Sequence, residues 1–267
     1  MTAQAIADAA ADADAAGARA GVALVSLDDP DALDRARDLF DLTWPALDGT
    51  TQVTPNLLRA LLHAGAHVGA AVDAAGQIVG ATLAFPAWSD DGHRHLHSHM
   101  AAVDPALRDR GIGRALKLHQ RVWALERGID TIAWTFDPLV RRNAELNLHR
   151  LGVEVGEYKV DFYGPLVDGI NTGEPTDRLV VWWRLDSPHV AAVVRQPRPL
   201  LDAQALRADG RAITGIAIPD DIVDLRTSDP IRAREWRLRV REEFVAAFGR
   251  GAHVIGLDTH GYVLEDS

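Results

Sequence analysis

The sequence contains no cysteine, which excludes disulfides, thiolate metal sites and a cysteine nucleophile. No apolar run approaches the roughly 18–20 residues that a membrane-spanning helix needs. The first twenty residues also lack the basic start and the continuous apolar stretch of a signal peptide. We therefore expect a cytoplasmic protein that does not bind a membrane.

Basic residues are fewer than acidic residues. The chain has 28 Lys and Arg against 38 Asp and Glu, a formal net charge of −10. This balance disfavours nucleic acid and anionic lipid as principal partners. Local clusters of basic residues are therefore more informative here than they would be on a basic protein.

Short apolar runs alternate with segments of helical spacing from residue 22 to residue 185, and this alternation predicts an α+β fold. We expect a central mixed sheet with helices on its faces. The predicted strands are 22–27, 67–72, 78–88, 93–103, 131–136, 153–163 and 179–185. The predicted helices are 31–44, 55–63, 113–127 and 138–151, and a turn-rich loop, 164–178, joins the last two strands.

Composition divides the chain into three parts. Residues 1–20 are alanine-rich and are expected to be a poorly ordered tail, and residues 21–186 form the predicted main domain. Residues 187–267 follow a proline-containing stretch and are expected to form a β-α-β extension, with a strand at 212–218, a helix at 229–248 and a strand at 254–264. The extension is expected to pack on the main domain or on a second copy of the chain, so a homodimer is one expected assembly.

The most informative segment is the turn Arg108-Asp109-Arg110-Gly111-Ile112-Gly113, between a predicted strand and a predicted helix. Its glycines lack a Cβ atom and let backbone N–H groups approach a ligand closely. A helix start favours a bound anion, and Arg114 adds a third arginine, so a diphosphate is the expected guest. A tight turn with solvated arginines stays open as the alternative. A dinucleotide fingerprint fits less well because Leu116 stands in place of the third glycine, and no Walker-type lysine follows.

The pattern Arg-x-x-Gly-x-Gly after a strand and before a helix resembles the acetyl-CoA loop of the GCN5-related N-acetyltransferase (GNAT) superfamily. The element order from Val22 to Leu185 resembles the fold of that superfamily. An uncharacterised bacterial subgroup with a C-terminal extension is similar at four further segments. They are Ser98-His99-Met100, Gln120-Arg121, the run from Trp134 to Leu139 and the run from Asn143 to Leu148.

The resemblance implies an acyl-CoA-dependent N-acyltransferase that moves an acetyl or short acyl group to a primary amine of a small molecule or protein. The alternative is a sensor that binds acyl-CoA without catalysis. The resemblance also implies that the backbone of the strand ending at Val103 binds the pantetheine of acetyl-CoA, or of another acyl-CoA. The other residues that it implies for the cofactor are Arg108, Arg110, Gly111, Ile112, Gly113, Arg114, Asn143 and Asn147. For the two asparagines, hydrogen bonding to the local backbone stays open.

The proton path is harder to predict. Histidines at positions 93, 95, 97 and 99 alternate along one strand, and His97 and His99 lie nearest its cofactor end, so they are the candidate general bases. Many family members carry a tyrosine acid at the position of Leu148. Tyr158 and Tyr163 are the candidate replacements, of which Tyr158 is the predicted one, and a thiolate that needs no dedicated acid stays open as the alternative. Asp137 either binds the amine substrate or caps the following helix. No carboxylate accompanies the histidines in that strand, so no metal site is expected.

Overall fold

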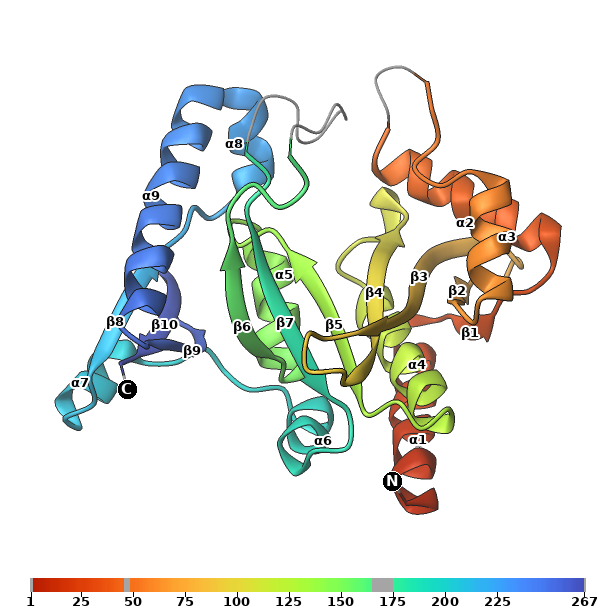
Figure 1. Ribbon diagram of the computed structural model, residues 1–267, viewed down its shortest axis with the longest axis horizontal. Helices are drawn as coiled ribbons and strands as arrows, with labels where there is room; N and C mark the ends of the chain where they lie inside the picture. The colour runs from red at the N-terminus through yellow and green to blue at the C-terminus, as the bar shows by residue number, and fades with distance from the viewer. Residues whose placement is uncertain (1, 46–48, 165–174, 267) are drawn as a thin grey trace. The chain divides into compact units, whose positions relative to one another are not determined.

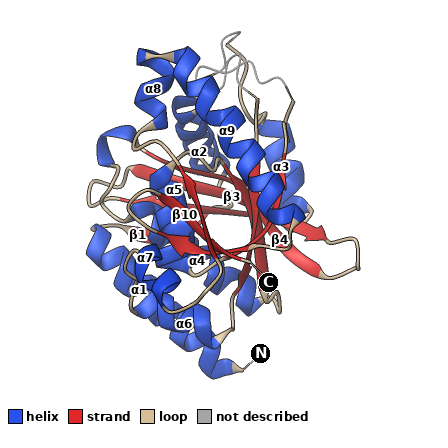
Figure 2. Ribbon diagram, turned by 90° about the vertical axis from the view of Figure 1, so that its left-hand side faces the viewer, coloured by secondary structure: helices blue, strands red, loops and turns tan. Residues whose placement is uncertain are grey.

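The computed structural model describes residues 2–45, 49–164 and 175–266. These residues form two compact units. Unit 1 comprises 2–134 and 184–187, and unit 2 comprises 135–164, 175–183 and 188–266. Helices and strands occur in both (Figure 2), which confirms the predicted α+β class. Residues 165–174 of the loop expected at 164–178 lie outside the described residues. The unit boundary after Trp134 differs from the domain boundary predicted at residue 186, and the division into 21–186 and 187–267 stays a prediction.

Unit 1 is built on the strand order β1-β2-β3-β4-β5, in which β4 and β5 are parallel and the other neighbours are antiparallel. Four predicted segments, those of α3, β2, β3 and β5, have the observed bounds. The last two residues of β5 belong to unit 2. In chain order, the elements are α1 (Ala3–Ala20), β1 (Ala23–Ser26), α2 (Pro30–Thr43), α3 (Pro55–His63), β2 (His67–Val72), β3 (Ile78–Trp88), β4 (Arg94–Val103), the 3₁₀ turn η1 (Pro105–Leu107), α4 (Ile112–Glu126) and β5 (Thr131–Phe136).

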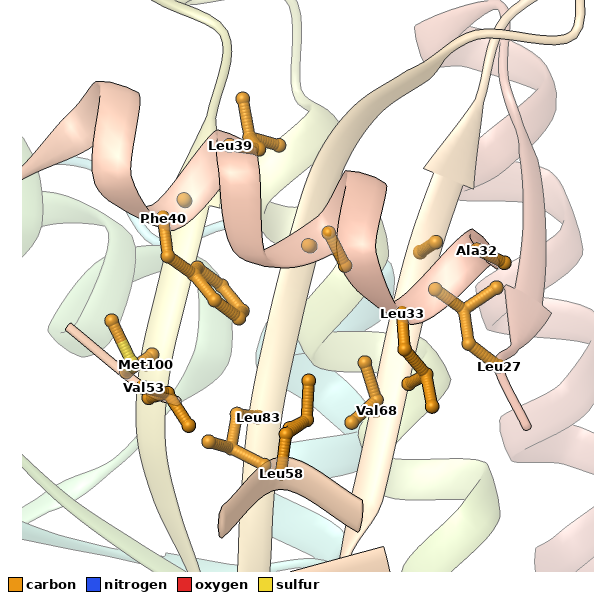
Figure 3. Close-up of a cluster of buried hydrophobic side chains, with 14 of the residues drawn as sticks. Leu27, Ala32, Leu33, Leu39, Phe40, Val53, Leu58, Val68, Leu83 and Met100 are labelled. Atoms are coloured by element: carbon orange, nitrogen blue, oxygen red, sulfur yellow. The ribbon is translucent and has the colours of Figure 1, made fainter. Parts of the chain in front are cut away.

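The helices α2 and α3 cover one face of the unit 1 sheet (Figure 1). Leu33 and Phe40, seven residues apart on α2, pack with Leu58 of α3 against Leu83 and Met100 of the sheet (Figure 3). Burial of each large apolar side chain contributes about 1.5–3 kcal/mol. This cluster therefore holds β3 and β4, the strands that lead to the Arg108–Gly113 turn.

The opposite face of the sheet carries α4. Side chains of consecutive β2 residues lie on opposite faces of the sheet. Ala70 belongs to the cluster under α2, whereas Ala71 packs with Ile112 and Leu116 of α4. A Cβ atom on Gly80 of β3 would come within 2.9 Å of the Ile112 and Leu116 side chains. Glycine at this position therefore lets the first turns of α4 lie directly on the sheet.

The predicted tail is wrong, because Ala3–Ala20 form the helix α1. Thr2 caps this helix by accepting a hydrogen bond from the Ala5 N–H, and Gly21 ends it in the left-handed conformation. Its buried residues, Ala9, Ala13, Ala16 and Gly17, recur at helical spacing, and α1 packs along α4. Alanine has the highest intrinsic helix propensity, so an alanine-rich segment with this spacing and both caps forms an ordered helix.

Unit 2 contains an antiparallel pair, β6 and β7, and a three-stranded antiparallel sheet of order β8-β10-β9. In chain order, the elements are α5 (Arg141–Glu145), the π-helix η2 (Leu146–Leu151), β6 (Glu154–Lys159), β7 (Arg178–Arg184), α6 (Pro188–Arg195), α7 (Ala203–Ala208), β8 (Ile213–Ala217), α8 (Ile222–Ser228), α9 (Pro230–Gly249), β9 (His253–Leu257) and β10 (Gly261–Glu265).

The predicted β-α-β extension is only partly right. The strand near 212–218 and the long helix are present as β8 and α9, but three shorter helices accompany them. The single strand predicted at 254–264 is a hairpin of β9 and β10, because the Asp258 carboxylate accepts hydrogen bonds from the His260 and Gly261 N–H groups and turns the chain. A Cβ atom on Gly261 would lie 2.1 Å from the Ile216 carbonyl oxygen, so glycine is required for this strand to approach β8.

None of the helices in the described part of the chain is both long and apolar enough to cross a bilayer.

Candidate active site

The Arg108–Gly113 turn connects β4 to α4 through two residues in the left-handed region, Asp109 at a φ of 64° and Gly111 at a φ of 83°. Arg108 before them is extended. A positive φ is strained for most side chains but not for glycine. Gly111 therefore allows the chain to reverse and to begin α4 at Ile112.

The first turn of α4 is open at both glycines. No heavy atom lies within 4 Å of a Cβ built on Gly111, and a Cβ on Gly113 would meet only Val103 Cγ2, at 3.8 Å. Gly111 occupies the cap position and offers no side chain to the N–H groups of the first turn, which have no acceptor within the helix itself. Together with the helix dipole, these groups form an anion-binding surface.

Charge around the turn is positive. Arg108 and Arg110 are exposed, Arg114 is partly buried in the first turn of α4, and Asp109 is the acidic residue among them. Ile112 is buried against the sheet, so it contributes its backbone to the turn and its side chain to the core. The predicted phosphate-binding residues 108–114 thus share one surface of unit 1, with Val103 beside Gly113.

The strand β4 separates from β5 soon after it begins. The two strands pair in parallel through Leu96–Ile132 and His97–Ala133. On its other edge β4 carries a bulge, because Met100 pairs with Leu83 and Ser98 pairs with Ala84, which leaves His99 out of register. We call the region from Ser98 onward, past the last β4–β5 pair, the β4–β5 fork.

His97 and His99 lie against Phe85 of β3. The ring centroids of His97 and His99 are 6.0 Å apart, and they lie 5.2 and 5.6 Å from that of Phe85. Burial lowers the pKa of His97 to about 4, with a smaller contribution from the His99 charge. Burial also lowers the pKa of His99. Both imidazoles are therefore neutral near pH 7 and can accept a proton, although His97 is a weak base.

The other two histidines of the predicted series have different surroundings. His93 precedes β4 and contacts Asp130 and Thr131, at 3.2 and 3.4 Å. His95 is buried. The structure therefore brings only His97 and His99 together around one aromatic ring.

Asp137 is not available to an amine substrate. Its Oδ2 accepts hydrogen bonds from Nη2 of Arg226 at 2.6 Å and of Arg237 at 2.7 Å, and its Oδ1 accepts from the Leu139 N–H at 2.9 Å. Burial alone would raise the pKa of Asp137, but the charges of Arg237 and Arg226 outweigh burial and hold it well below the usual range. The structure favours a structural carboxylate over the predicted substrate contact.

Tyr158 is also committed to the structure of unit 2. Its hydroxyl donates to Asp177 Oδ2 at 2.7 Å, and its ring stacks on Phe244. Burial and the Asp177 charge raise the pKa of Tyr158 far above its ordinary value. A hydroxyl held in this way is a poor general acid, so these contacts disfavour the role predicted for Tyr158, which stays a prediction.

The two predicted asparagines lie in unit 2, on α5 and η2. Asn143 is partly exposed, and Asn147 is buried in the π-helical turn, where its carbonyl oxygen accepts from the Gly152 and Val153 N–H groups. Leu148, at the position of the family's usual tyrosine, is buried. The cofactor contact predicted for Asn143 and Asn147 stays a prediction.

One buried polar cluster in unit 1 was missed at the sequence level. Lys117 of α4 donates to Ser98 Oγ at 2.7 Å, and Ser98 donates to Gln120 Oε1 at 2.9 Å. Lys117 stands between two leucines in a segment of helical spacing. Such a position is also common for a lysine on the surface of a helix. The available signal was composition, because Lys117 is one of only two lysines in a chain with 28 basic residues.

The family model described as "Acetyltransferase (GNAT) family" matches residues 33–153, a segment that contains β2 to β5, the Arg108–Gly113 turn and α4. No curated protein matches the sequence. Three solved structures illustrate the range of similar folds. An aminoglycoside acetyltransferase from an uncultured soil metagenomic sample, in complex with sisomicin, is 18% identical over 44% of this chain and 78% of that chain, with a TM-score of 0.39.

The Arabidopsis thaliana protein Naa50, in complex with the bisubstrate analogue CoA-Ac-MVNAL, is 17% identical over 61% of this chain and 97% of that chain, with a TM-score of 0.46. An acetyltransferase of the GNAT family from Streptococcus pneumoniae is 13% identical over 60% of this chain and 98% of that chain, with a TM-score of 0.48. The residues of the Arg108–Gly113 turn and of the β4–β5 fork all lie inside the segment that the family model matches. Residues 33–153 are therefore the part of the chain that is similar to the acetyltransferase (GNAT) family.

Proposed function

We propose that the chain is an acyl-CoA-dependent N-acyltransferase, which moves an acetyl or short acyl group from CoA to a primary amine of a small molecule or peptide. The observation that carries the proposal is the open first turn of α4 at Gly111 and Gly113, within the segment that matches the family model. We also propose that the protein acts in the bacterial cytoplasm and that a homodimer is one assembly open to it.

The residues of the turn fit the diphosphate of CoA. Its backbone N–H groups and the helix dipole favour an anion, and Arg108, Arg110 and Arg114 supply positive charge around it. Beyond His97, β4 has left its ladder with β5. Peptide groups on that edge, from Ser98 to Val103, are therefore suited to bind the amides of the pantetheine arm.

Acyl transfer needs a neutral amine, a polarised thioester carbonyl and a proton for the departing thiolate. His97 and His99 are neutral near pH 7 and supply the proton acceptors closest to the fork on β4. Backbone N–H groups at the β4 bulge are suited to polarise the carbonyl. CoA supplies the activated acyl group, and the chain supplies position, charge and proton transfer.

The first experiment measures CoA binding and folding stability on the same variant, Gly113→Glu. A Cβ at position 113 meets only Val103, at 3.8 Å, so the fold is preserved. A carboxylate in the first turn of α4 stabilises the helix by about 0.3–1 kcal/mol, and replacing a helical glycine adds about 0.5–1 kcal/mol. The same carboxylate repels a diphosphate.

We expect calorimetry to show CoA binding to the unaltered protein, and Gly113→Glu to lose that binding while its midpoint of unfolding stays equal or rises. Gly249→Glu on α9 of unit 2 is the control, because it adds the same charge outside the turn and a Cβ there meets no atom within 4 Å. This control should bind CoA normally. Equal CoA affinity of the two glutamate variants would contradict the proposed site.

The sensor alternative has one specific observation in its favour. Leu148 replaces the family's usual tyrosine, and the Tyr158 hydroxyl donates its hydrogen bond to Asp177. Release of free CoA thiol from acetyl-CoA, measured with a panel of primary amines, separates the two functions. Amine-dependent thiol release supports the transferase, whereas CoA binding without release from any amine in the panel supports the sensor.

A further inference from the structure

The amine of Lys117 is enclosed in unit 1. The lysine is 5% exposed, its Nζ donates to Ser98 Oγ at 2.7 Å, and it lies 3.9 Å from the ring centroid of Trp134 on β5. Ser98 in turn donates to Gln120 Oε1, and the buried Nε2 of Gln120 has no acceptor among the described residues. We call Lys117 and Ser98 the Lys117–Ser98 pair. The pair belongs to a buried cluster in which one hydrogen-bond donor, the Gln120 amide, has no acceptor among the described residues.

No carboxylate neutralises Lys117 within the described part of the chain. A buried ammonium without an acidic partner is strongly disfavoured. Burial accordingly lowers the pKa of Lys117 from 10.5 to about 7. The amine therefore exchanges between its charged and neutral forms in the range where acyl transfer to an amine takes place.

The other charged and titratable groups around α4 are not the cause of the lowered pKa of Lys117. Asp12 of α1 pairs with Arg121 of α4. Burial lowers the pKa of His119, and the charges of Glu126 and Asp14 oppose this shift only in part. On β4, the charge of Lys117 contributes to lowering the pKa of His97. The remaining groups on α4 and on the elements packed against it are Asp8 and Arg19 of α1, His67 of β2, Arg94, His95 and His99 of β4, and Arg114 and Glu126 of α4. Burial is the cause that lowers the pKa of Lys117.

The position of the pair connects it to the proposed reaction. Ser98 is the first residue of β4 beyond the last pair with β5, at the bulge where the β4–β5 fork opens. It precedes Val103, which lies beside the phosphate-binding turn, by five residues or about 16 Å of extended strand. An acyl donor held by its diphosphate at the turn, with its arm along β4, brings its reactive end toward this part of the strand.

We propose that Lys117 is a positioning residue that holds the proton for the leaving thiolate and delivers it through the hydroxyl of Ser98. This inference rests on the proposed acyltransferase function. The amine nitrogen forms a bond to the acyl carbon, and the bond from that carbon to sulfur breaks with its electron pair going to sulfur. The Ser98 hydroxyl gives its proton to that sulfur and takes one from the Lys117 ammonium. Lys117 is left neutral, the amine that has reacted gives up its proton to His97 or His99, and Lys117 regains a proton from water.

The chemistry of the pair suits this role. A general acid works best when its pKa lies near the operating pH, and a serine hydroxyl can turn from Gln120 toward another acceptor because it rotates freely. The residues otherwise expected to supply the proton do not, since position 148 is a leucine and Tyr158 is bound to Asp177. The Lys117–Ser98 pair therefore fills a function that the usual residue leaves vacant.

The titration of Lys117 is directly measurable, because the chain has two lysines, Lys117 and Lys159. NMR of protein labelled with ¹³C at lysine Cε gives one signal from each. Lys159 is 45% exposed beside Glu157 and is the internal control. We expect the signal that is lost in Lys117→Met to titrate near pH 7. Titration of that signal near the ordinary lysine value of 10.5 would overturn the proposal.

The second measurement combines CoA binding with the pH profile of turnover. Lys117→Met, which keeps the length of the side chain, and Ser98→Ala should both bind CoA like the unaltered protein. Both should lower turnover at saturating acetyl-CoA by about 10²-fold or more and should remove the loss of turnover above pH 7. Normal turnover with an unchanged pH profile in either variant would overturn the proposal and leave the proposed function intact. Failure of the unaltered protein to bind CoA would overturn both.

Discussion

Asp137 supports two arginines inside unit 2, and its replacement gives the largest stability effect that we predict. Its side chain is 9% exposed, and those of Arg226 and Arg237 are 11% and 1% exposed. The substitution Asp137→Asn keeps the shape of the side chain and an oxygen for the Leu139 N–H. It removes the negative charge from both guanidinium groups and turns an amide donor toward them.

Removing one member of a buried ion pair costs about 3–5 kcal/mol, because the remaining charge is left uncompensated in a medium of low polarity. Here one carboxylate contacts both arginines, so we expect Asp137→Asn to lower the free energy of unfolding by about this amount. Arg226→Met removes one of the two partners and leaves the contact to Arg237. It should cost less, about 1–2 kcal/mol.

The effect also has a defined pH dependence. The native pKa of Asp137 is lower than that of the unfolded chain, so its contribution to stability is present above the unfolded value of about 3.9. The contribution is lost as pH falls through the native pKa. The difference between the unaltered protein and Asp137→Asn should therefore be constant from pH 5 to pH 7 and should shrink below about pH 4.

Urea unfolding followed by circular dichroism at a series of pH values measures these differences, with Arg226→Met as the partner variant. A cost of less than about 1 kcal/mol for Asp137→Asn at pH 7 would refute the reasoning. That result would mean that the arginines do not depend on this carboxylate, and it would return Asp137 to consideration as an amine-binding residue.

Three further predictions address other parts of the fold. Burial lowers the pKa of His67 to about 3. As pH falls below about 6.5, the histidine therefore gains a proton in the unfolded chain but not in the folded protein, and the free energy of unfolding decreases. Urea unfolding should show that His67→Phe removes up to about 1.4 kcal/mol of this loss per pH unit. Gly261→Ala drives a Cβ into the Ile216 carbonyl oxygen and should cost about 3 kcal/mol or more. Thermal unfolding should show a smaller loss, about 1 kcal/mol, for the control Gly210→Ala, which has a positive φ and open space. Ala13→Arg on the buried face of α1 should cost more than about 2 kcal/mol, whereas Ala15→Arg on its exposed face should change stability by less than about 0.5 kcal/mol; equal effects in chemical unfolding would contradict the packing of α1.

Local sequence signals identified most of unit 1. The helix α3 was predicted with its observed bounds, because Thr54 supplies a side-chain cap and Pro55 the first helical residue. The strands β2 and β3 were predicted equally well, since a glycine-containing turn separates two apolar runs. The Arg108–Gly113 turn was recognisable because its backbone geometry is imposed by glycine within six consecutive residues.

The errors have physical causes that lie outside local sequence. The helix α1 was missed because its packing stripe consists of alanines, which give no contrast between an apolar and a polar face. The sequence did not show the ion pairs and hydrogen bonds of Asp137 and Tyr158, because their partners are distant in the chain. Asp137 meets its two arginines 89 and 100 residues away, and Tyr158 meets its aspartate 19 residues away.

The Lys117–Ser98 pair shows the same limit. The two residues lie on different elements, and only the packing of α4 on β4 encloses the amine. Sequence can mark a lysine as unusual in an arginine-rich chain, but it cannot show that this lysine is buried without a carboxylate.

The central claim is that the backbone of the Arg108–Gly113 turn and the first turn of α4 bind the diphosphate of CoA. Hydrogen exchange of the unaltered protein, with and without saturating CoA, tests it most directly. We predict slower amide exchange in a peptide spanning residues 108–116, with a smaller effect along 98–103. CoA binding that leaves exchange at 108–116 unchanged, or no change anywhere in the chain, would contradict the account.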